Sequence, residues 1–162
     1  MFKIAVLISG NGSNLEALID ACKKNLISGS VEIIISNNPD AYGIQRAKNH
    51  FINYKIIDNN RFETREDFDR SLVEELQDSN PDLIVLAGFM RILTPVMIEA
   101  FKNKIINIHP SLLPKYPGLD THNSVVKNGD LKHGVTIHYV NEVLDGGQII
   151  AQGEISVNAN ET

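Results

Sequence analysis

An amide and an imidazole stand two residues apart in the stretch 105–118, where Asn107 and His109 precede a proline-rich run. Side chains alternate between the two faces of a strand, so these two are expected to project toward the same side. Pro110 ends the strand because it has no N–H to donate to a ladder. Such a pair at a strand end, before a stiff loop, is a good place for chemistry. Taken alone, however, it is better explained as two hydrogen-bonding groups at a strand terminus.

Asp145 stands before two glycines, in a turn that reads Leu-Asp-Gly-Gly. An Asp in this setting is usually an ordinary turn former. A carboxylate close to an imidazole favours the charged form of the ring, so Asp145 gains a functional interpretation if it meets His109. The separation of the two residues in the sequence does not decide whether they meet.

The other histidines and the single cysteine lack the spacing of metal ligands, and no metal site is predicted. His50 is expected at the surface, at the end of a helix, and His133 in a turn. His122 and His138 are candidates for pocket residues without a pattern of their own. Cys22 falls on the apolar face of a predicted helix, where we expect it to pack in the core.

The residues Gly-Asn-Gly-Ser-Asn at 10–14 separate a predicted strand from a predicted helix. Glycines in such a loop let backbone N–H groups approach an anion at the helix N-terminus. Leu15 replaces the third glycine of the dinucleotide fingerprint, so a single phosphate fits better than a pyrophosphate. Ser13 and Glu16 have the spacing of a capping box, which explains the polar residues without a ligand. The residues alone favour neither interpretation, and both can hold together.

A second loop, Ala-Gly-Phe-Met-Arg-Ile-Leu at residues 87–93, follows another predicted strand. Ligands of parallel α/β folds bind outside the carboxyl ends of the strands. Main-chain groups together with Met90, Ile92 and Leu93 are suited to hold a flat heterocycle. The apolar content alone favours a hydrophobic loop that closes over the core, with Arg91 as a solvated charge.

Apolar periodicity predicts the elements that position these residues. Strands are predicted at residues 3–9, 31–36, 54–57, 83–86 and from 105. Helices are predicted after residue 14 and at 42–50, 65–77, 94–101 and 122–128, with Thr94 as an N-cap. This alternation predicts an α/β fold with a Rossmann-like, doubly wound and mostly parallel sheet. The strands predicted at 134–140 and 148–155 leave no room for a crossover helix, so this C-terminal pair is predicted to be antiparallel.

The length of 162 residues predicts a single domain, residues 1–162. The net charge of −5 argues against a general nucleic-acid binder, which would carry a basic face. No run has the length of a membrane span, and no signal segment is recognised. A lone cysteine fits a reducing compartment. We therefore predict a cytoplasmic, soluble enzyme that acts on neither nucleic acid nor membrane.

Four runs of the chain resemble the bacterial phosphoribosylglycinamide formyltransferases of purine biosynthesis. They are I-S-G-N-G-S-N-L, L-A-G-F-M-R-I-L, N-I-H-P-S-L-L-P-K-Y-P-G and L-D-G-G, in the family's order and spacing. Methionyl-tRNA formyltransferase and formyltetrahydrofolate hydrolase share the Asn-x-His…Asp chemistry, but the G-N-G-S-N loop and the K-Y-P-G-L run resemble the glycinamide enzyme. The resemblance implies transfer of a formyl group from 10-formyltetrahydrofolate to the amine of glycinamide ribonucleotide, without a metal.

The resemblance also implies a role for each matched residue. The implied catalytic residues are Asn107, His109 and Asp145. The implied ligands of the substrate phosphate are Gly12, Ser13 and Asn14. The implied folate contacts are Arg65, Met90, Arg91, Ile92, Leu93 and Asn107.

Amine attack on a formyl carbon makes a tetrahedral species with a developing oxyanion, where a preorganised donor is worth roughly 3–4 kcal/mol. Asn107 can donate through its amide. A cationic His109 can also donate, and it can supply the proton that the departing folate nitrogen needs. Asp145 is expected to hold His109 in the charged form near neutral pH.

Two departures from the family pattern bear on these expectations. Asp120 stands where family members commonly have a His, although His122 is retained. The family chain continues beyond Thr162 into a tail with a further helix, expected to begin at about residues 158–162, and a Glu that contacts the substrate amine. Two alternatives therefore stay open: a folate-dependent formyltransferase for another amine, such as an amino sugar nucleotide, or a non-catalytic folate- or phosphate-binding domain. The sequence does not decide between a monomer and a homodimer.

Overall fold

The computed structural model describes residues 1–157 and divides the chain into two compact units, residues 1–105 and the residues from Ile106 onward. Each unit is built around strands of its own. The single domain expected over residues 1–162 stays a prediction. The start of a further helix at residues 158–162 lies outside the described residues.

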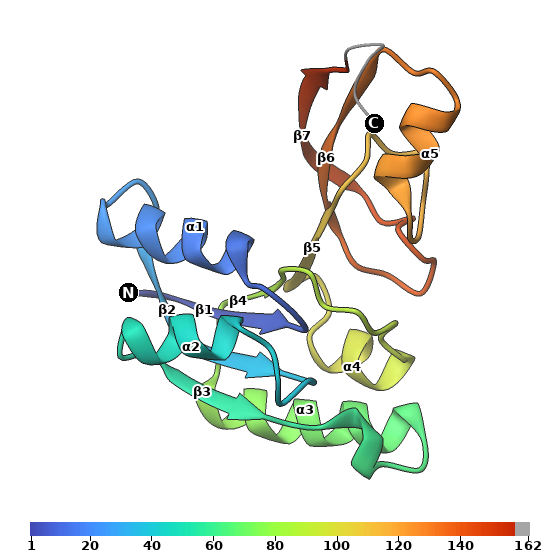
Figure 1. Ribbon diagram of the computed structural model, residues 1–162. Coiled ribbons are helices and arrows are strands. Elements are labelled where there is room, and N and C mark those ends of the chain that lie inside the picture. Colours follow the sequence, from blue (N-terminus) through green and yellow to red (C-terminus); the bar gives the residue numbers. More distant parts are fainter. Residues whose placement is uncertain (158–162) are drawn as a thin grey trace. The chain divides into compact units, whose positions relative to one another are not determined.

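Strands and helices alternate through the first unit, in the order expected from the sequence (Figure 1). Its strands pair in the order β3, β2, β1, β4, and the pairs β1–β2, β1–β4 and β2–β3 are parallel. The elements are β1 (Phe2–Ile8), α1 (Ser13–Lys23), β2 (Gly29–Ser36), α2 (Gly43–Asn49), β3 (Asn53–Ile56), the short 3-10 helix η1 (Asn59–Arg61), α3 (Arg65–Ser79), β4 (Leu83–Leu86) and α4 (Pro95–Ala100).

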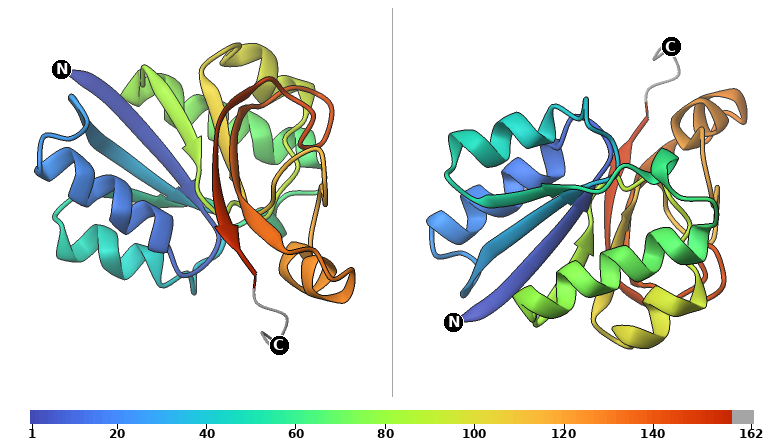
Figure 2. Two further views of the ribbon diagram at one scale, coloured as in Figure 1. Left: turned by 90° about the horizontal axis from the view of Figure 1, so that it is seen from above. Right: turned by 90° about the horizontal axis from the view of Figure 1, so that it is seen from below.

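Strand β1 lies inside this sheet and is covered on both faces. Its residues 4–8 are at most 3% exposed, and each fully buried Val, Leu or Ile side chain contributes about 1.5–3 kcal/mol of transfer free energy. A strand buried on both faces needs an apolar residue at every position, which explains its continuous apolar run. Helices α1 and α2 cover one face of the sheet, and α3 and α4 cover the other (Figure 2). This two-sided cover is the doubly wound arrangement predicted from the sequence.

The capping box predicted for α1 is not formed. Gly12 is the N-cap residue, with φ at 75°, and no side chain caps the helix. Ser13 is already the first helical residue, and Glu16 binds Arg46 and His50 instead of the helix N-terminus. The spacing of a capping box is present, but the Glu16 carboxylate binds the charged or polar groups of Arg46 and His50 instead. Cys22 of the same helix, expected in the core, is only half-buried.

Helix α4 begins as predicted, with Thr94 as its N-cap residue and Pro95 in the first turn. The side chain of Thr94 does not cap the helix, however. Its hydroxyl donates to Oδ2 of Asp69 at 2.7 Å, and its N–H donates to the same oxygen at 2.6 Å. Asp69 is 1% exposed and was not singled out from the sequence. A buried carboxylate on α3 therefore fixes the start of α4.

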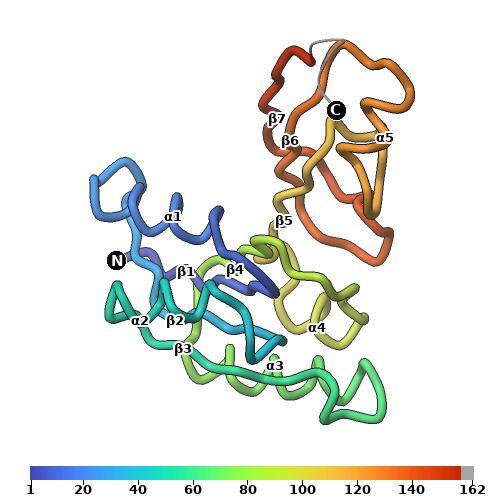
Figure 3. The backbone as a smooth tube through the Cα atoms, viewed as in Figure 1, coloured from blue at the N-terminus to red at the C-terminus, as the bar shows by residue number. Residues whose placement is uncertain are grey.

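The second unit contains β5 (Ile105–His109), α5 (Thr121–Lys127), β6 (Lys132–Tyr139) and β7 (Ile149–Ser156). Strand β6 pairs antiparallel with β5 and with β7, and the β6–β7 connection forms a wide loop (Figure 3). The predicted antiparallel C-terminal pair is thus confirmed. The placement of His133 in a turn is wrong: His133 is a buried residue of β6, because the pairing with β7 extends to Lys132, opposite Ser156.

The predicted fold class is confirmed: an α/β fold with a mostly parallel sheet and antiparallel C-terminal strands. The bounds of the elements differ from those predicted by a few residues at most, as helix and strand ends commonly do. Within residues 1–157, none of the helices combines the length and the apolar character that a membrane crossing requires.

Candidate active site

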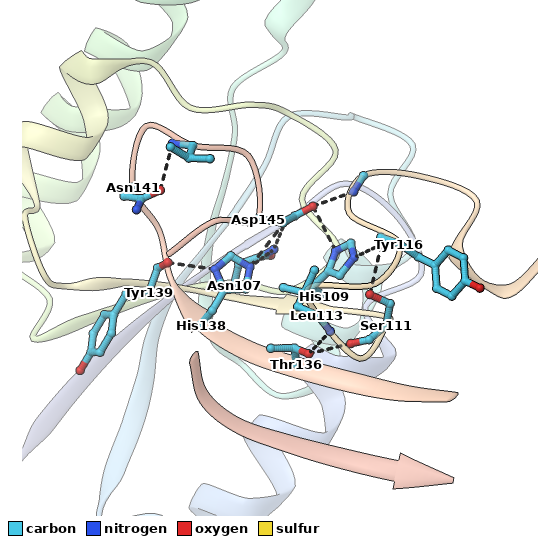
Figure 4. A network of polar contacts seen from close by, with 12 residues as sticks. Asn107, His109, Ser111, Leu113, Tyr116, Thr136, His138, Tyr139, Asn141 and Asp145 are labelled. Atoms are coloured by element: carbon cyan, nitrogen blue, oxygen red, sulfur yellow. Dashed lines mark hydrogen bonds and ion pairs between the residues drawn. The ribbon is translucent and has the colours of Figure 1, made fainter. Parts of the chain in front are cut away.

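The carboxylate of Asp145 is the centre of a buried polar cluster in the second unit (Figure 4). The Asp145 side chain is 7% exposed. Its Oδ2 lies 3.4 Å from Nδ1 of His109 and accepts a hydrogen bond from the N–H of Gly118 at 2.8 Å. Its Oδ1 lies 3.4 Å from the amide nitrogen of Asn107 and 3.5 Å from Nε2 of His138. One buried carboxylate therefore faces four nitrogen groups.

Strand geometry explains how the cluster is assembled. Asn107 and His109 reach the carboxylate from the same face of β5, as the period of two predicts. Asp145 comes from the β6–β7 connection, and its φ of 50° lies in the left-handed region. That conformation costs an ordinary L-residue roughly 1–2 kcal/mol, and Asp and Asn tolerate it best. The Leu-Asp-Gly-Gly turn thus aims a carboxylate at the end of β5 as well as reversing the chain.

Both ring nitrogens of His109 face acceptors, and the side chain is 4% exposed. Nδ1 faces Asp145, and Nε2 lies 2.8 Å from the backbone carbonyl oxygen of Tyr116. A carbonyl oxygen can only accept, so Nε2 carries a proton. A second proton on Nδ1 gives the imidazolium, which can donate to both partners. Both ring nitrogens of His109 therefore have an acceptor within the second unit.

His138 completes the cluster, although no sequence pattern singled it out beyond a candidate pocket residue. Its Nδ1 lies 2.9 Å from the carbonyl oxygen of Tyr139 and donates to it. Its Nε2 lies 3.2 Å from the amide nitrogen of Asn107 and 3.5 Å from Oδ1 of Asp145. The NH₂ group of Asn107 therefore faces Asp145 as well as His138. The signal that would have found His138 is the strand register, which places it opposite Asn107.

Two buried hydroxyl groups hold the loop that follows β5. Ser111 and Thr136 are both 0% exposed. The hydroxyl of Ser111 donates to the carbonyl oxygens of Lys115 at 2.6 Å and Tyr116 at 3.1 Å. The hydroxyl of Thr136 donates to the carbonyl oxygen of Ser111 at 2.7 Å and accepts from the N–H of Leu113 at 3.0 Å. The loop that carries the Tyr116 carbonyl is thereby fixed to β6, and sequence patterns missed both residues.

The predicted phosphate ligands lie in the first unit, where β1 leads into α1. The first N–H groups of a helix have no partner within the helix, and no side chain caps α1. Ser13 and Asn14 are exposed residues at this helix N-terminus. N–H groups at such a position commonly bind anions. A Cβ atom at Gly12 would lie 2.8 Å from Cα of Gly43, so only glycine fits this close approach.

The predicted folate segment alternates between core and surface. Phe89 and Leu93 are buried, whereas Met90 is 65% exposed and Ile92 is 55% exposed. The N–H of Met90 donates to the hydroxyl of Ser9 at 2.7 Å, which ties the segment to the end of β1. The loop therefore closes over the core with two residues and presents two apolar side chains outward. The folate contacts of this segment stay a prediction.

The charged folate candidates also lie in the first unit. Arg91 is half-buried, and its guanidinium lies 5.9 Å from the ring centroid of Phe68. Arg65 is the exposed first residue of α3. The structure thus gathers the predicted catalytic residues within the second unit, whereas the phosphate and folate candidates apart from Asn107 belong to the first.

A histidine pair lies outside this cluster in the second unit. Nδ1 of His122 is 2.6 Å from Nε2 of His133. Burial lowers the pKa of the His133 imidazole, and the nearby His122 lowers it further. No hydrogen-bond partner of His133 Nδ1 is found in the part of the chain that the structure describes. The two rings therefore form a structural pair, with the buried ring kept neutral.

The chain is similar over nearly its whole length to proteins of known name. The formyl transferase family, described as "Formyl transferase", matches residues 2–162. Phosphoribosylglycinamide formyltransferase of Escherichia coli (strain K12) is 49% identical over 159 residues, which are 98% of this chain and 75% of that protein. The enzyme of the same name from Haemophilus influenzae is 47% identical over 157 residues, 97% of this chain and 74% of that protein.

Solved structures agree with these sequence relatives. The crystal structure of glycinamide ribonucleotide transformylase 1 from Symbiobacterium toebii matches with a TM-score of 0.97 and 41% identity, and the match covers 100% of this chain and 76% of that one. The phosphoribosylglycinamide formyltransferase of Coxiella burnetii matches with a TM-score of 0.94 and 45% identity, over 99% of this chain and 75% of that one. This chain spans about three quarters of the length of each relative named here.

Proposed function

The chain belongs to the formyl transferase family, and from this premise we propose that it transfers a formyl group from 10-formyltetrahydrofolate to the amine of glycinamide ribonucleotide. The choice of acceptor is carried by one observation, the similarity over 98% of the chain to a phosphoribosylglycinamide formyltransferase. The reaction belongs to de novo purine biosynthesis, and its site of action is the cytoplasm. The buried cluster around Asp145 supports the proposal, because it holds the kinds of groups that formyl transfer needs.

Formyl transfer moves a carbonyl group from one nitrogen atom to another. The amine of the ribonucleotide attacks the formyl carbon, and the carbonyl oxygen becomes an oxyanion in a tetrahedral intermediate. The bond from carbon to the folate nitrogen then breaks, that nitrogen gains a proton, and the attacking amine loses one. The enzyme must therefore stabilise an oxyanion and supply a proton to the departing nitrogen.

In the proposed mechanism, Asn107 donates an N–H to the oxyanion. Its NH₂ group lies 3.2 Å from Nε2 of His138 and 3.4 Å from Oδ1 of Asp145, so the N–H at the longer contact leaves Asp145 for the oxyanion when charge develops. His109, as the imidazolium, stabilises the same oxyanion and gives a proton to the folate nitrogen. The neutral ring then takes up, through solvent, the proton that the attacking amine loses, which restores the imidazolium. Asp145 orients this ring and balances its charge, which matters more in a buried site than in water.

The proton on Nε2 of His109 is directed at the Tyr116 carbonyl oxygen. A reacting group that takes this proton competes with that carbonyl for it. The loop that carries Tyr116 is therefore part of the proposed site, because its position decides which acceptor the imidazolium meets. The hydroxyl of Ser111, which also donates to this carbonyl, keeps it satisfied when His109 turns to the reactants.

The proposed substrate contacts lie in the first unit. The backbone N–H groups at Gly12, Ser13 and Asn14 bind the phosphate of the ribonucleotide, as helix N-termini commonly do. The exposed side chains of Met90 and Ile92 pack against the flat ring of the folate, together with main-chain groups up to Leu93. Two further proposed contacts, Arg65 and Arg91, bring positive charge toward the folate carboxylates, while Asn107 serves both the oxyanion and the folate.

The proposed activity is tested by formyl transfer with the purified protein. Glycinamide ribonucleotide and 10-formyltetrahydrofolate are supplied, and the appearance of tetrahydrofolate is followed by absorbance. Turnover with this acceptor, and none with an amino sugar nucleotide, is the expected result. Turnover only with another amine would replace the proposed acceptor. Folate binding by calorimetry without turnover on any amine would overturn the activity in favour of a binding domain.

A further inference from the structure

A polar network in the first unit joins α2 to the loop before α1. The guanidinium of Arg46 reaches this loop from α2, and its Nε donates to the backbone carbonyl oxygen of Asn11 at 2.9 Å. Nη2 donates to the side-chain Oδ1 of Asn11 at 2.9 Å, and Nη1 donates to Glu16 at 3.1 Å. All three nitrogen atoms of one guanidinium are thus bound by the loop and the first turns of α1.

Glycine residues allow this close approach of helix and loop. The N–H of Gly43, the first residue of α2, donates to the carbonyl oxygen of Gly10 at 3.0 Å. A Cβ atom at Gly12 would lie 2.8 Å from Cα of Gly43 and 3.4 Å from Cδ of Arg46. The ring of Tyr42 lies 5.1 Å from the guanidinium carbon and supports it from a further side. The side chain of Arg46 is therefore held firmly over residues 10–12.

The direction of the loop oxygens matters for an anion. Asn11 carries two acceptor oxygens, and both are turned toward Arg46. An oxygen that faced a phosphate would repel it, whereas N–H groups attract it. Because Arg46 binds both oxygens, neither of them faces an anion at the start of α1, and the N–H groups there stay available to it.

A second contribution comes from the charge of Glu16, which lies one turn into α1. The hydrogen bond from His50, at 2.6 Å, lowers the pKa of the Glu16 carboxyl, as does its contact with Arg46. The carboxylate is therefore ionised at neutral pH, and its charge would oppose an anion at this helix N-terminus. The ion pair with Arg46 offsets that charge.

We propose that Arg46 is a positioning residue for the phosphate of the substrate. It acts through Asn11, whose oxygens it turns away from the phosphate, and through Glu16, whose charge it offsets. The inference rests on the proposed function, in which the loop at residues 12–14 binds that phosphate. A lysine has a single nitrogen and cannot hold both oxygens of Asn11 and the carboxylate together, so Arg46→Lys is not a conservative change here.

The test compares Arg46→Met and Arg46→Lys with the unaltered protein in steady-state formyl transfer. For Arg46→Met, we expect KM for glycinamide ribonucleotide to rise about tenfold or more, because charge-assisted hydrogen bonds are lost. The kcat should stay within about twofold, and KM for 10-formyltetrahydrofolate should not change. Arg46→Lys should recover less than half of the lost affinity. Calorimetry with glycinamide riboside, which lacks the phosphate, should give equal affinities for all three proteins.

Arg70→Met is the matched control, because Arg70 lies on α3 with its side chain 58% exposed and pairs only with Asp67 among the charged groups of residues 1–157. This control should leave both KM values unchanged. Asn11→Ala is a second variant that keeps Arg46 and removes one of the two oxygens that it holds. It should raise KM for the ribonucleotide in the same selective way, by a smaller factor.

The outcomes separate this inference from the proposed function. Binding of glycinamide ribonucleotide to the unaltered protein, with equal binding to Arg46→Met, would overturn the inference and leave the function standing. Failure of the unaltered protein to bind the ribonucleotide would overturn the function itself. A fall in kcat with both KM values unchanged, together with a lower Tm, would show that Arg46 has only a structural role and would also overturn the inference.

Discussion

Two carboxylates stand at the centres of polar clusters, but their partners are held differently. Asp145 is 7% exposed, and its side-chain partners lie at 3.4–3.5 Å. Glu16 is 32% exposed, and its partners lie at 2.6 and 3.1 Å. Short bonds in the Glu16 cluster mean that the protein itself satisfies the carboxylate. Catalytic hydrogen bonds are often long in proteins without bound reactants and tighten when the reactants bind. The contrast agrees with the two roles that we propose, reaction for the Asp145 cluster and positioning for the Glu16 cluster.

Among the variants that test this contrast, Asp145→Asn is expected to have the largest effect, a loss of kcat. Asn has the same size and tolerates the left-handed backbone, but it removes the charge that faces His109. We expect kcat to fall roughly 10³–10⁴-fold, as the loss of the carboxylate does in other Asp–His pairs. Steady-state kinetics measures the loss, and thermal unfolding shows whether the variant is folded. A kcat within tenfold of normal would remove Asp145 from the mechanism.

Asn107→Ala tests the donor on the other side of the same carboxylate. We expect kcat to fall about 10²–10³-fold, the usual result of removing one oxyanion donor. Asn123→Ala is the matched control, because Asn123 is an exposed residue of α5 that bonds to Asp120. The control should have normal kinetics. Equal losses in the two variants would mean that the effect comes from the fold of the second unit and not from the amide of Asn107.

Asp69→Asn tests a carboxylate that is buried, as Asp145 is, but makes two short hydrogen bonds with Thr94. Burial raises the pKa of the Asp69 carboxyl above its ordinary value of 3.8. Between 3.8 and the higher pKa of the folded state, the folded protein holds a proton that the unfolded chain has lost. The free energy of unfolding therefore falls as pH rises through this range. Urea unfolding between about pH 4 and 7 measures this slope. The slope should be smaller in Asp69→Asn, and parallel profiles for the two proteins would contradict the assignment.

Glu16→Gln is expected to have the smallest effect. Its hydrogen bond with His50 lowers the pKa of Glu16, so the stabilisation is present above the ordinary value of 4.5 and is lost as pH falls through the lower value of the folded state. A carboxylate that is one-third exposed contributes at most about 1 kcal/mol near neutral pH. Urea unfolding at pH 7 and in acid measures the difference. A loss above roughly 2 kcal/mol in the free energy of unfolding would contradict this expectation, because it is typical of a buried ion pair.

The elements of the fold could be predicted because burial requires apolar residues in a fixed period. Strand β1 showed its two covered faces as an unbroken apolar run, and the short β6–β7 connection excluded a crossover helix. The predictions failed where a partner distant in sequence decides the outcome. Glu16 had the spacing of a cap but binds Arg46, and His133 looked like a turn residue until the pairing of β6 with β7 extended the strand.

The candidate site followed the same rule. The common face of Asn107 and His109 is a local consequence of strand geometry, and it was predicted correctly. Their contact with Asp145 depends on how the β6–β7 connection folds back. Composition and periodicity do not predict this path of the chain. His138 and Thr136 depend on the register between β5, its following loop and β6, so neither could be placed before that register was known.

The left-handed backbone of Asp145 also bears on how the protein can change over generations. Bulky and β-branched residues are strained at this position, whereas Asn and Gly fit it at least as well as Asp does. The substitutions that the fold accepts most readily are therefore those that remove the carboxylate. Selection for folding alone would not keep an acid there. In a duplicated gene under selection for folding alone, Asn or Gly at position 145 is the change we expect first. Under the mechanism that we propose, such a protein would fold but would lose formyl transfer.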